Sequence, residues 1–562
     1  MNRRTLVTIA VLLAGGVCIW FGRRGIFGLD RKAEPGPLPS SPVLVASFPD
    51  PPANVPLHPE PYVPRPRGTI TFNEQIASIV YAKCGGCHRE GEAAPFPLLT
   101  FAEVSARSDQ ILDVIQSGYM PPWPPADGYG NFAAPRKLSV DQRGMFAQWI
   151  AEGCAEGTQP PPPRPEWTKG WKMGPPDLVL QMPERYPLQA EGTDVFRNFV
   201  LPIPIDQRRY VVGFEFRVSA PTAVHHARMF LDKTPASRQR DARDPGPGFS
   251  NLLEGVVEDP AGHWLGWTPG KQPTMLPAGI AWQLDPGTDL VIELHMLPSG
   301  KQETVQISMG LYFNDSPPTR IPQVIRLGPR FMDIPAGEKN HVVRDAYRLP
   351  VAATIRSVYA HAHYLGKRIE GYAVLPDGSK KWLLRIDHWD FNWQDEYRYA
   401  DPIAVPKGTQ LVMQFTYDNS SDNFRNPHVP PQRVFYGLES FSEMAELWLQ
   451  VLPQDRAAGA VLEKDYVRRE EDMQIDGYRQ EILARPERAE PRFRLAALLA
   501  ARQQTDEAIK FYQEGFQMDP RNSVARNNFG VLMAQLGKIA EAREQFRRAV
   551  EEIGRASCRE RV

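Results

Sequence analysis

The sequence predicts a chain of several domains: a small α-helical domain, two antiparallel β-sandwiches of the jelly-roll kind, and helical repeats at the C-terminus. The chain has 562 residues, which at roughly 150 residues per domain predicts about three or four domains. The 56 Pro residues favour linkers and short-stranded β domains over helical bundles. The 65 basic and 66 acidic side chains nearly cancel, which disfavours a general nucleic-acid binder.

The N-terminus predicts a membrane anchor followed by a tether. Residues 5–22 form an uncharged run between two pairs of Arg, and this is the only long apolar stretch. Its length lies between that of a signal peptide and that of a membrane span, and no small-x-small cleavage site ends it. We expect residues 1–24 to be an uncleaved anchor, with a cleaved signal as the alternative. Residues 25–67 are rich in Pro and predict an extended linker.

Changes in pattern divide the middle of the chain. Residues 68–158 have helical patterning around one Cys cluster, and a second Pro-rich linker covers residues 159–175. Short runs rich in Val, Ile, Phe and Tyr then alternate with Pro and Gly, which is typical of antiparallel β-sandwiches. We assign one sandwich to residues 176–325 and a second to residues 326–453. The clearest strand-like runs are Tyr210–Val218, Asp289–Met296 and Gln410–Tyr417.

Helical patterning returns over residues 470–551 with a period of 34 residues, at which Leu495–Ala496 recurs as Phe529–Gly530. This period and these residue types resemble tetratricopeptide repeats, which imply a protein or peptide partner. Residues 552–562 read EIGRASCRERV, the translation of a common sequencing-adapter oligonucleotide. We expect these last residues to be an assembly artefact and the repeats to be truncated.

The segment Cys84-Gly85-Gly86-Cys87-His88 is a CxxCH motif. Two thiols at this spacing can form thioether bonds to one haem, and the adjacent His can then bind its iron. Met120, followed by Pro, is the expected second axial ligand, because a thioether opposite His suits electron transfer. Met145 is the rival, but its helical surroundings favour packing in a core. A redox CxxC pair followed by an incidental His is the alternative for the whole motif.

Residues 72–157 resemble a class I cytochrome c across their whole length. The resemblance implies one covalently bound haem c, held by Cys84, Cys87, His88 and Met120. Haem attachment occurs outside the cytoplasm, so the resemblance also implies on which side of the membrane the chain lies. It implies that the part after the anchor lies in a bacterial periplasm or at the cell exterior, tethered to the inner membrane by residues 5–22.

A second set of candidate ligands lies in the β region. In a strand, residues i and i+2 share a face, so His361 and His363 can bind one metal ion. His225 and His226 would point to opposite faces unless the strand ends or bulges, or unless the rings use different nitrogens. Imidazole suits Cu, Zn, Fe or Ni, whereas the thioether of Met444 favours copper. In chain order the candidates are His225, His226, His295, His361, His363 and Met444.

This order of ligands resembles the copper type II, ascorbate-dependent monooxygenases, such as the peptidylglycine α-hydroxylating and dopamine β-monooxygenases. The resemblance covers residues 176–453, which would form both copper domains. It implies two copper ions, one for electron transfer and one for O2 activation. Their ligands would be, in turn, His225, His226 and His295, and then His361, His363 and Met444.

The resemblance implies an enzyme, a copper type II monooxygenase that hydroxylates a C–H bond of an unknown organic or peptide substrate with O2. A fused haem would deliver electrons from a periplasmic or respiratory donor. The alternative is a membrane-anchored electron-transfer or scaffold protein with a non-catalytic copper-binding module. A zinc hydrolase is disfavoured, because zinc chemistry needs no electrons. We expect structural or surface roles for the remaining candidates, which are His263, His341, His388, His428 and the free thiol of Cys154.

Overall fold

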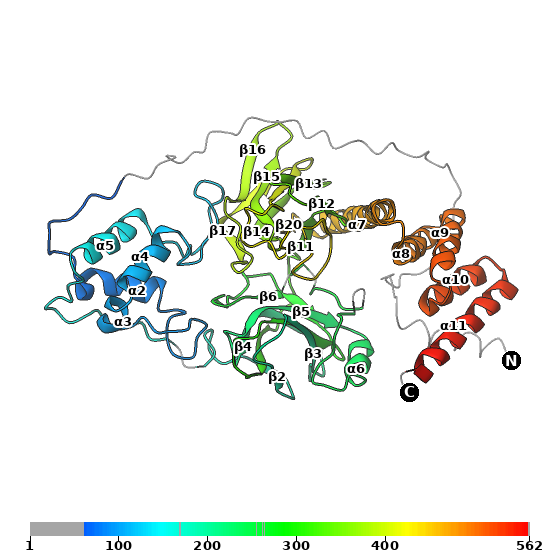
Figure 1. Ribbon diagram of the computed structural model, residues 1–562, viewed down its shortest axis with the longest axis horizontal. Helices are drawn as coiled ribbons and strands as arrows, with labels where there is room; N and C mark the ends of the chain where they lie inside the picture. Colours follow the sequence, from blue (N-terminus) through cyan, green and yellow to red (C-terminus); the bar gives the residue numbers. More distant parts are fainter. Residues whose placement is uncertain (1–60, 168–169, 254–255, 261, 264, 560–562) are drawn as a thin grey trace.

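A computed structural model describes residues 61–559, apart from residues 168–169, 254–255, 261 and 264. The predicted anchor and most of the first predicted linker lie outside the described residues. Among the described helices, none is both long and apolar enough to span a bilayer. Helices lie at both ends of this part of the chain and strands lie between them (Figure 1). The predicted β-rich centre and helical C-terminal segment are therefore confirmed.

The first segment is a small bundle with its own apolar core, which includes Phe72, Phe146 and Trp149. Two of its helices begin with a capping box. The side chain of Thr100 or Ser139 accepts a hydrogen bond from the backbone N–H of the third helical residue, and the side chain of that third residue accepts one from the backbone N–H of the cap. Its elements are the π-helical turn η1 (Phe72–Ile76) and the helices α2 (Ala77–Lys83), α3 (Phe101–Ser105), α4 (Ser108–Gln116) and α5 (Val140–Ala151).

The next segment has two four-stranded sheets, in the orders β1-β10-β4-β7 and β3-β8-β5-β6, with antiparallel pairing throughout. Both sheets contribute side chains to one core, as in a sandwich. Its elements are β1 (Leu178–Gln181), β2 (Tyr186–Leu188), β3 (Val195–Pro202), β4 (Arg209–Val218), β5 (Val224–Asp232), α6 (Ala236–Asp241), β6 (Leu265–Trp267), β7 (Trp282–Leu284), β8 (Asp289–Met296), β9 (Glu303–Val305) and β10 (Ile307–Asn314).

A second sandwich follows, with sheets in the orders β11-β20-β14-β17 and β13-β18-β15-β16 around a second core. In β18, Leu411, Met413 and Phe415 all contribute to this core, at the period of two that residues on one face of a strand have. Its elements are β11 (Gln323–Leu327), β12 (Asp333–Ile334), β13 (His341–Arg348), β14 (Ala353–His361), β15 (Gly366–Val374), β16 (Lys380–Ile386), β17 (Glu396–Val405), β18 (Gln410–Tyr417), β19 (Val434–Phe435) and β20 (Glu446–Pro453).

The C-terminal helices share a core that contains Leu495 and Phe529, two of the positions that repeat along the sequence. The first and longest helix also joins this segment to the second sandwich, since the Tyr347 hydroxyl donates to Asp465 Oδ1 at 2.7 Å. The helices are α7 (Arg456–Ala484), α8 (Glu490–Ala501), α9 (Thr505–Met518), α10 (Ser523–Gln535) and α11 (Ile539–Arg559).

The loop between α4 and α5, residues 117–139, leaves the helical bundle and reaches β17 of the second sandwich (Figure 1). We call it the docking loop. Phe132 pairs with Tyr399 as an isolated antiparallel bridge, and their rings stack with centroids 5.3 Å apart. The backbone N–H of Ala133 donates to Arg398 at 2.8 Å, and that of Ala400 donates to Asn131 at 2.9 Å. The bundle is therefore packed directly on the second sandwich.

Replacing Phe132 with Ala should destabilise this packing by about 3–5 kcal/mol, the usual cost of removing a buried Phe side chain. Phe132 is 8% exposed and belongs to the core of the second sandwich. Phe424→Ala is the matched control, because Phe424 is 86% exposed and should change stability by no more than about 0.5 kcal/mol. Urea unfolding followed by Trp fluorescence measures both variants, and equal stability would contradict a docked loop.

Candidate metal centres

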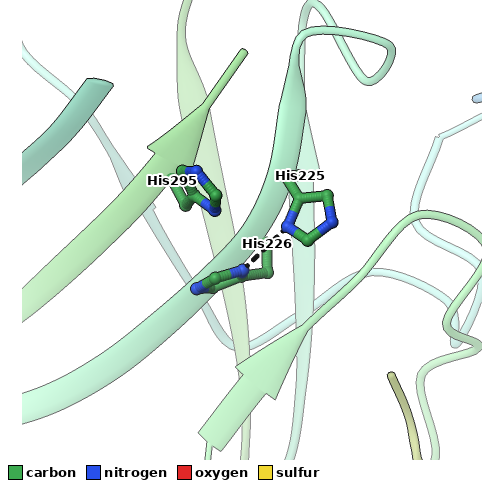
Figure 2. A group of neighbouring side chains, drawn as sticks. All are labelled: His225, His226 and His295. Carbon is green, nitrogen blue, oxygen red and sulfur yellow. Dashed lines mark hydrogen bonds between the residues drawn. The ribbon is translucent and has the colours of Figure 1, made fainter. Parts of the chain in front are cut away.

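A bulge in β5 brings three His side chains together. Pairing of β5 with β8 shifts between Val224 and His226, so that Val224 lies opposite Met296 and His226 opposite His295. The extra residue re-aims His225, which a regular strand would point to the other face. One nitrogen of each of His225, His226 and His295 lies within 4.8 Å of the others, and the rings converge (Figure 2).

The surroundings of this group favour neutral imidazoles, which is the form that binds a metal ion. Burial, followed by the nearby His295 and His361, lowers the pKa of His225 to about 3. Burial also lowers the pKa of His226 well below its ordinary value. Nδ1 of His225 lies 3.1 Å from Nδ1 of His226, too close for two protonated nitrogens.

Asp194 fixes the orientation of the third imidazole. Its carboxylate accepts a hydrogen bond from Nε2 of His295 at 3.1 Å, and Phe196 stacks on the same ring with centroids 4.2 Å apart. Nδ1 of His295 is buried and has no hydrogen-bond partner among the described residues. A buried nitrogen left without a partner beside two other imidazoles fits a metal ligand, and three nitrogen donors suit copper.

Strand pairing places the backbone of the second set of candidate ligands in one region. His361 ends β14 and pairs with Glu446 at the start of β20, and the backbone N–H groups of His363 and Met444 both donate to Oε1 of Glu443. The His361 and His363 ring centroids are 5.1 Å apart, and Met444 is 7% exposed. Two imidazoles and a soft thioether form a donor set that fits copper.

Each imidazole of this second group is oriented by a hydrogen bond at Nδ1, which leaves Nε2 free to bind a metal ion. Nδ1 of His361 donates to Gln394 Oε1 at 2.6 Å, and Nδ1 of His363 donates to the Ser442 carbonyl at 3.1 Å. Burial lowers the pKa of both His residues, that of His363 to about 3. Both rings are therefore neutral at physiological pH.

Glu443 holds the loop that carries Met444. Its buried carboxylate accepts backbone hydrogen bonds from His363, Leu365 and Met444. The Met444 carbonyl accepts a hydrogen bond from the Tyr417 hydroxyl at 2.7 Å. These contacts fix the backbone at two of the three candidate ligands without using their donor atoms.

Phe391 lies between the two groups of His. Its ring stacks on His225 with centroids 4.8 Å apart and meets His363 at 5.7 Å with an interplanar angle of 79°. Phe391 is 3% exposed, so a buried apolar ring lies at this boundary. Asp194, Phe391, Gln394 and Glu443 were not among the site residues predicted from the sequence. Only the position of Glu443 next to Met444 offered a signal in the sequence.

The CxxCH segment forms a turn at the end of α2. The backbone N–H groups of Cys87 and His88 both donate to the Cys84 carbonyl, at 3.1 and 2.9 Å, and the two thiols are not disulfide-bonded. Nδ1 of His88 donates to the Phe96 carbonyl at 3.1 Å, which leaves Nε2 for an axial bond. Two free thiols and an oriented imidazole in one turn fit a covalently attached haem.

The two candidate axial Met residues lie in different places. Met120 is half-buried at the start of the docking loop, where its N–H donates to the Val114 carbonyl at 2.9 Å. Met145 lies in α5 and packs against the core of the helical bundle. Its place in the bundle core agrees with the packing expected of it, and Met120 as axial ligand stays a prediction.

The other His residues of the described part of the chain lie apart from these groups. His263 is 3% exposed, and its Nδ1 accepts a hydrogen bond from Gln450 of the second sandwich at 3.4 Å. His341 lies 3.3 Å from Glu338, Nε2 of His428 donates to the Phe441 carbonyl at 3.0 Å, and His388 is exposed. Cys154 is half-buried, shortly after α5 ends.

Lowering the pH should destabilise the protein through His263. Burial lowers the pKa of His263 in the folded chain to about 4, whereas its ordinary pKa, which we take for the unfolded chain, is 6.5. Between these two pH values the unfolded chain binds a proton at this residue and the folded chain does not. Stability is then lost as the pH falls from about 6.5 to 4, by at most about 1.4 kcal/mol per pH unit. His263→Gln should flatten the dependence of unfolding free energy on pH, and the exposed-residue control His388→Gln should not. Equal slopes in both variants and the wild type would contradict this assignment.

Asp194→Asn should weaken copper binding at the three-His group by about 10–100-fold, the usual cost of losing a carboxylate behind a metal-bound imidazole. The matched control is Asp315→Asn, because the Asp315 side chain is 99% exposed. Titration against a chelator of known copper affinity measures both. Unchanged affinity in Asp194→Asn would show that the carboxylate does not support a metal ligand.

Comparison with known proteins gives two family matches. Residues 344–447 match the C-terminal domain of copper type II ascorbate-dependent monooxygenases, and residues 499–555 match the tetratricopeptide repeat. No curated protein matches the chain. The predicted repeat is thus confirmed, and His361, His363 and Met444 all lie inside the first match.

Two solved structures show only remote likeness. The major capsid protein P2 from bacteriophage PM2 is 11% identical with a TM-score of 0.20, covering 46% of this chain and 97% of the capsid protein. The structure named pT26-6p is 8% identical with a TM-score of 0.09, covering 67% of this chain and 92% of its own. TM-scores this low do not indicate a shared fold. The chain therefore contains a domain similar to the C-terminal domain of the copper type II ascorbate-dependent monooxygenases, followed by a tetratricopeptide repeat.

Proposed function

We propose that this protein is a copper-dependent monooxygenase that hydroxylates a C–H bond with O2 and receives its electrons through a haem c on the same chain. The observation that carries the proposal is that His361 and His363 lie side by side, with Glu443 holding the backbone of both His363 and Met444, inside the segment that matches the copper monooxygenase domain. The neighbouring three-His group supports a second copper ion. Copper at these positions would supply one-electron redox chemistry and reduction of O2.

The residues around the second group have roles in this proposal that follow from their contacts. Gln394 and the Ser442 carbonyl orient the imidazoles, so that both Nε2 atoms stay available. Glu443 and Tyr417 fix the Met444 backbone. Phe391 places a buried apolar ring between the two groups of His.

Electron supply is the second part of the proposal. Hydroxylation by O2 consumes two added electrons and two protons, forms the hydroxylated product and releases one water. A single haem passes electrons one at a time. The geometry of Cys84, Cys87 and His88 supports a haem in that role, with Met120 as its other axial ligand. An external one-electron donor would reduce the haem twice in each turnover.

Localisation and partners follow from the same proposal. Covalent haem attachment places the chain in the periplasm or at the cell exterior, with residues 5–22 as anchor. The substrate is an organic molecule or a peptide. The C-terminal repeat, which contacts the second sandwich through α7, would bind a protein partner or hold a protein substrate near the copper ions.

Replacing Met444 with Ala should remove the soft ligand, so copper content should fall from about two ions per chain to one and hydroxylation should be lost. Haem reduction should be unaffected. Met413→Ala is the matched control, because Met413 is a fully buried core residue of the same sandwich and should cost about 2–5 kcal/mol in stability without loss of copper. Elemental analysis and Cu–S scattering in X-ray absorption measure the difference. Retention of both copper ions and of hydroxylation in Met444→Ala would overturn the proposed O2 site.

A further inference from the structure

The docking loop touches the loop that supports the candidate copper ligands. The Tyr119 and Trp393 rings meet edge to face, with centroids 5.7 Å apart and an interplanar angle of 68°. Tyr119 immediately precedes Met120, the proposed axial ligand of the haem. Trp393 lies in residues 387–395 between β16 and β17, which we call the support loop. One aromatic contact therefore separates the two proposed redox sites along this path.

The support loop reaches both groups of copper ligands. Gln394 follows Trp393 directly and accepts a hydrogen bond from Nδ1 of His361 at 2.6 Å. Phe391 lies two residues before Trp393 and stacks on His225, with centroids 4.8 Å apart. Two hydrogen bonds within the loop hold its shape. The backbone N–H of Trp393 donates to the Asp390 carbonyl at 3.0 Å, and Nε2 of Gln394 donates to the Phe391 carbonyl at 2.8 Å.

Contacts on both sides hold the CxxCH turn and the docking loop against the β region. Arg136 of the docking loop forms an ion pair of 2.9 Å with Asp395 of the support loop. On the first sandwich, Gly270 leaves room for the haem motif, since a Cβ there would lie 3.0 Å from Cys87 Sγ. Both sandwiches therefore contact the segment that would carry the haem, so its distance from the copper ligands is set by packing.

We infer that Tyr119 and Trp393 form the route by which electrons pass from the haem to the copper ions. The inference rests on the proposed function, because it needs both a haem and copper. In each step one electron leaves ferrous haem iron, which becomes ferric, and one Cu(II) becomes Cu(I). No covalent bond forms or breaks, and the haem regains its electron from an external one-electron donor protein.

Aromatic side chains suit this role because their π electrons couple a donor to an acceptor more strongly than an aliphatic side chain does. Trp393 is well placed to pass an electron onward, because its neighbours contact the rings of His361 and His225. Tyr129 and Trp382 offer an internal comparison. They make a similar edge-to-face contact across the same interface, with centroids 4.8 Å apart, but Trp382 lies in β16 and not in the support loop.

The test delivers one electron to the haem of the full chain, loaded with haem and copper, by flash excitation of a ruthenium reductant in the absence of O2. Decay of ferrous haem absorbance then reports transfer to copper. Trp393→Leu should slow this decay by about tenfold or more, equivalent to a rise in activation free energy of at least about 1.4 kcal/mol. Trp382→Leu should decay like the wild type. Tyr119→Leu repeats the test at a residue that is 45% exposed and so tolerates substitution.

The controls separate the route from the function on which it rests. Copper content and the haem reduction potential should be the same in all variants, so a slower decay reports the pathway. A chain that binds no haem or no copper would overturn the proposed function and this inference together. A chain that binds both metals, but in which Trp393→Leu decays as fast as Trp382→Leu, would overturn the route alone. Decay in the wild type as slow as in copper-free protein would overturn the proposed electron supply through the haem, and this inference with it.

Discussion

The Asp194 carboxylate joins the two halves of the candidate site, and the rest of the arrangement depends on that contact. The same oxygen, Oδ2, accepts a hydrogen bond from Nε2 of His295 at 3.1 Å and from the Ser440 hydroxyl at 2.8 Å. His295 belongs to the first sandwich, whereas Ser440 belongs to the loop that leads to Met444. One charged group therefore orients a candidate ligand and fixes the distance between the two sandwiches. Hydrogen bonding from His295 and Ser440 holds the pKa of Asp194 well below its usual range, so it stays ionised.

Packing joins the domains of the described chain to one another. The docking loop adds Phe132 to the core of the second sandwich, and Arg326, which forms an ion pair with Glu446 at 3.1 Å, also lies 3.8 Å from Glu470 of α7. A Pro-rich tether alone would allow the segment with the CxxCH motif to move relative to the candidate copper ligands. The observed contacts instead fix Tyr119 against Trp393.

Sequence patterns predicted the parts of the structure that depend on local order. The apolar run Tyr210–Val218 became β4, which begins one residue earlier, and the 34-residue period became packed helices. Local patterns could not predict the bulge that brings His225 and His226 to one side, because it is defined by pairing with β8. Asp194, Gln394 and Phe391 were missed for the same reason, since each acts on a ligand that lies far away in the sequence.

The proposed function requires that haem and copper on one chain share electrons on the way to O2. Its most direct test is to purify the full chain after haem maturation, quantify iron and copper, and follow haem oxidation when O2 is added to the reduced protein. We expect one haem iron and two copper ions per chain. We also expect haem oxidation to become much slower when copper is removed. Haem without copper under copper-replete conditions, or oxidation at the same rate with and without copper, would contradict it.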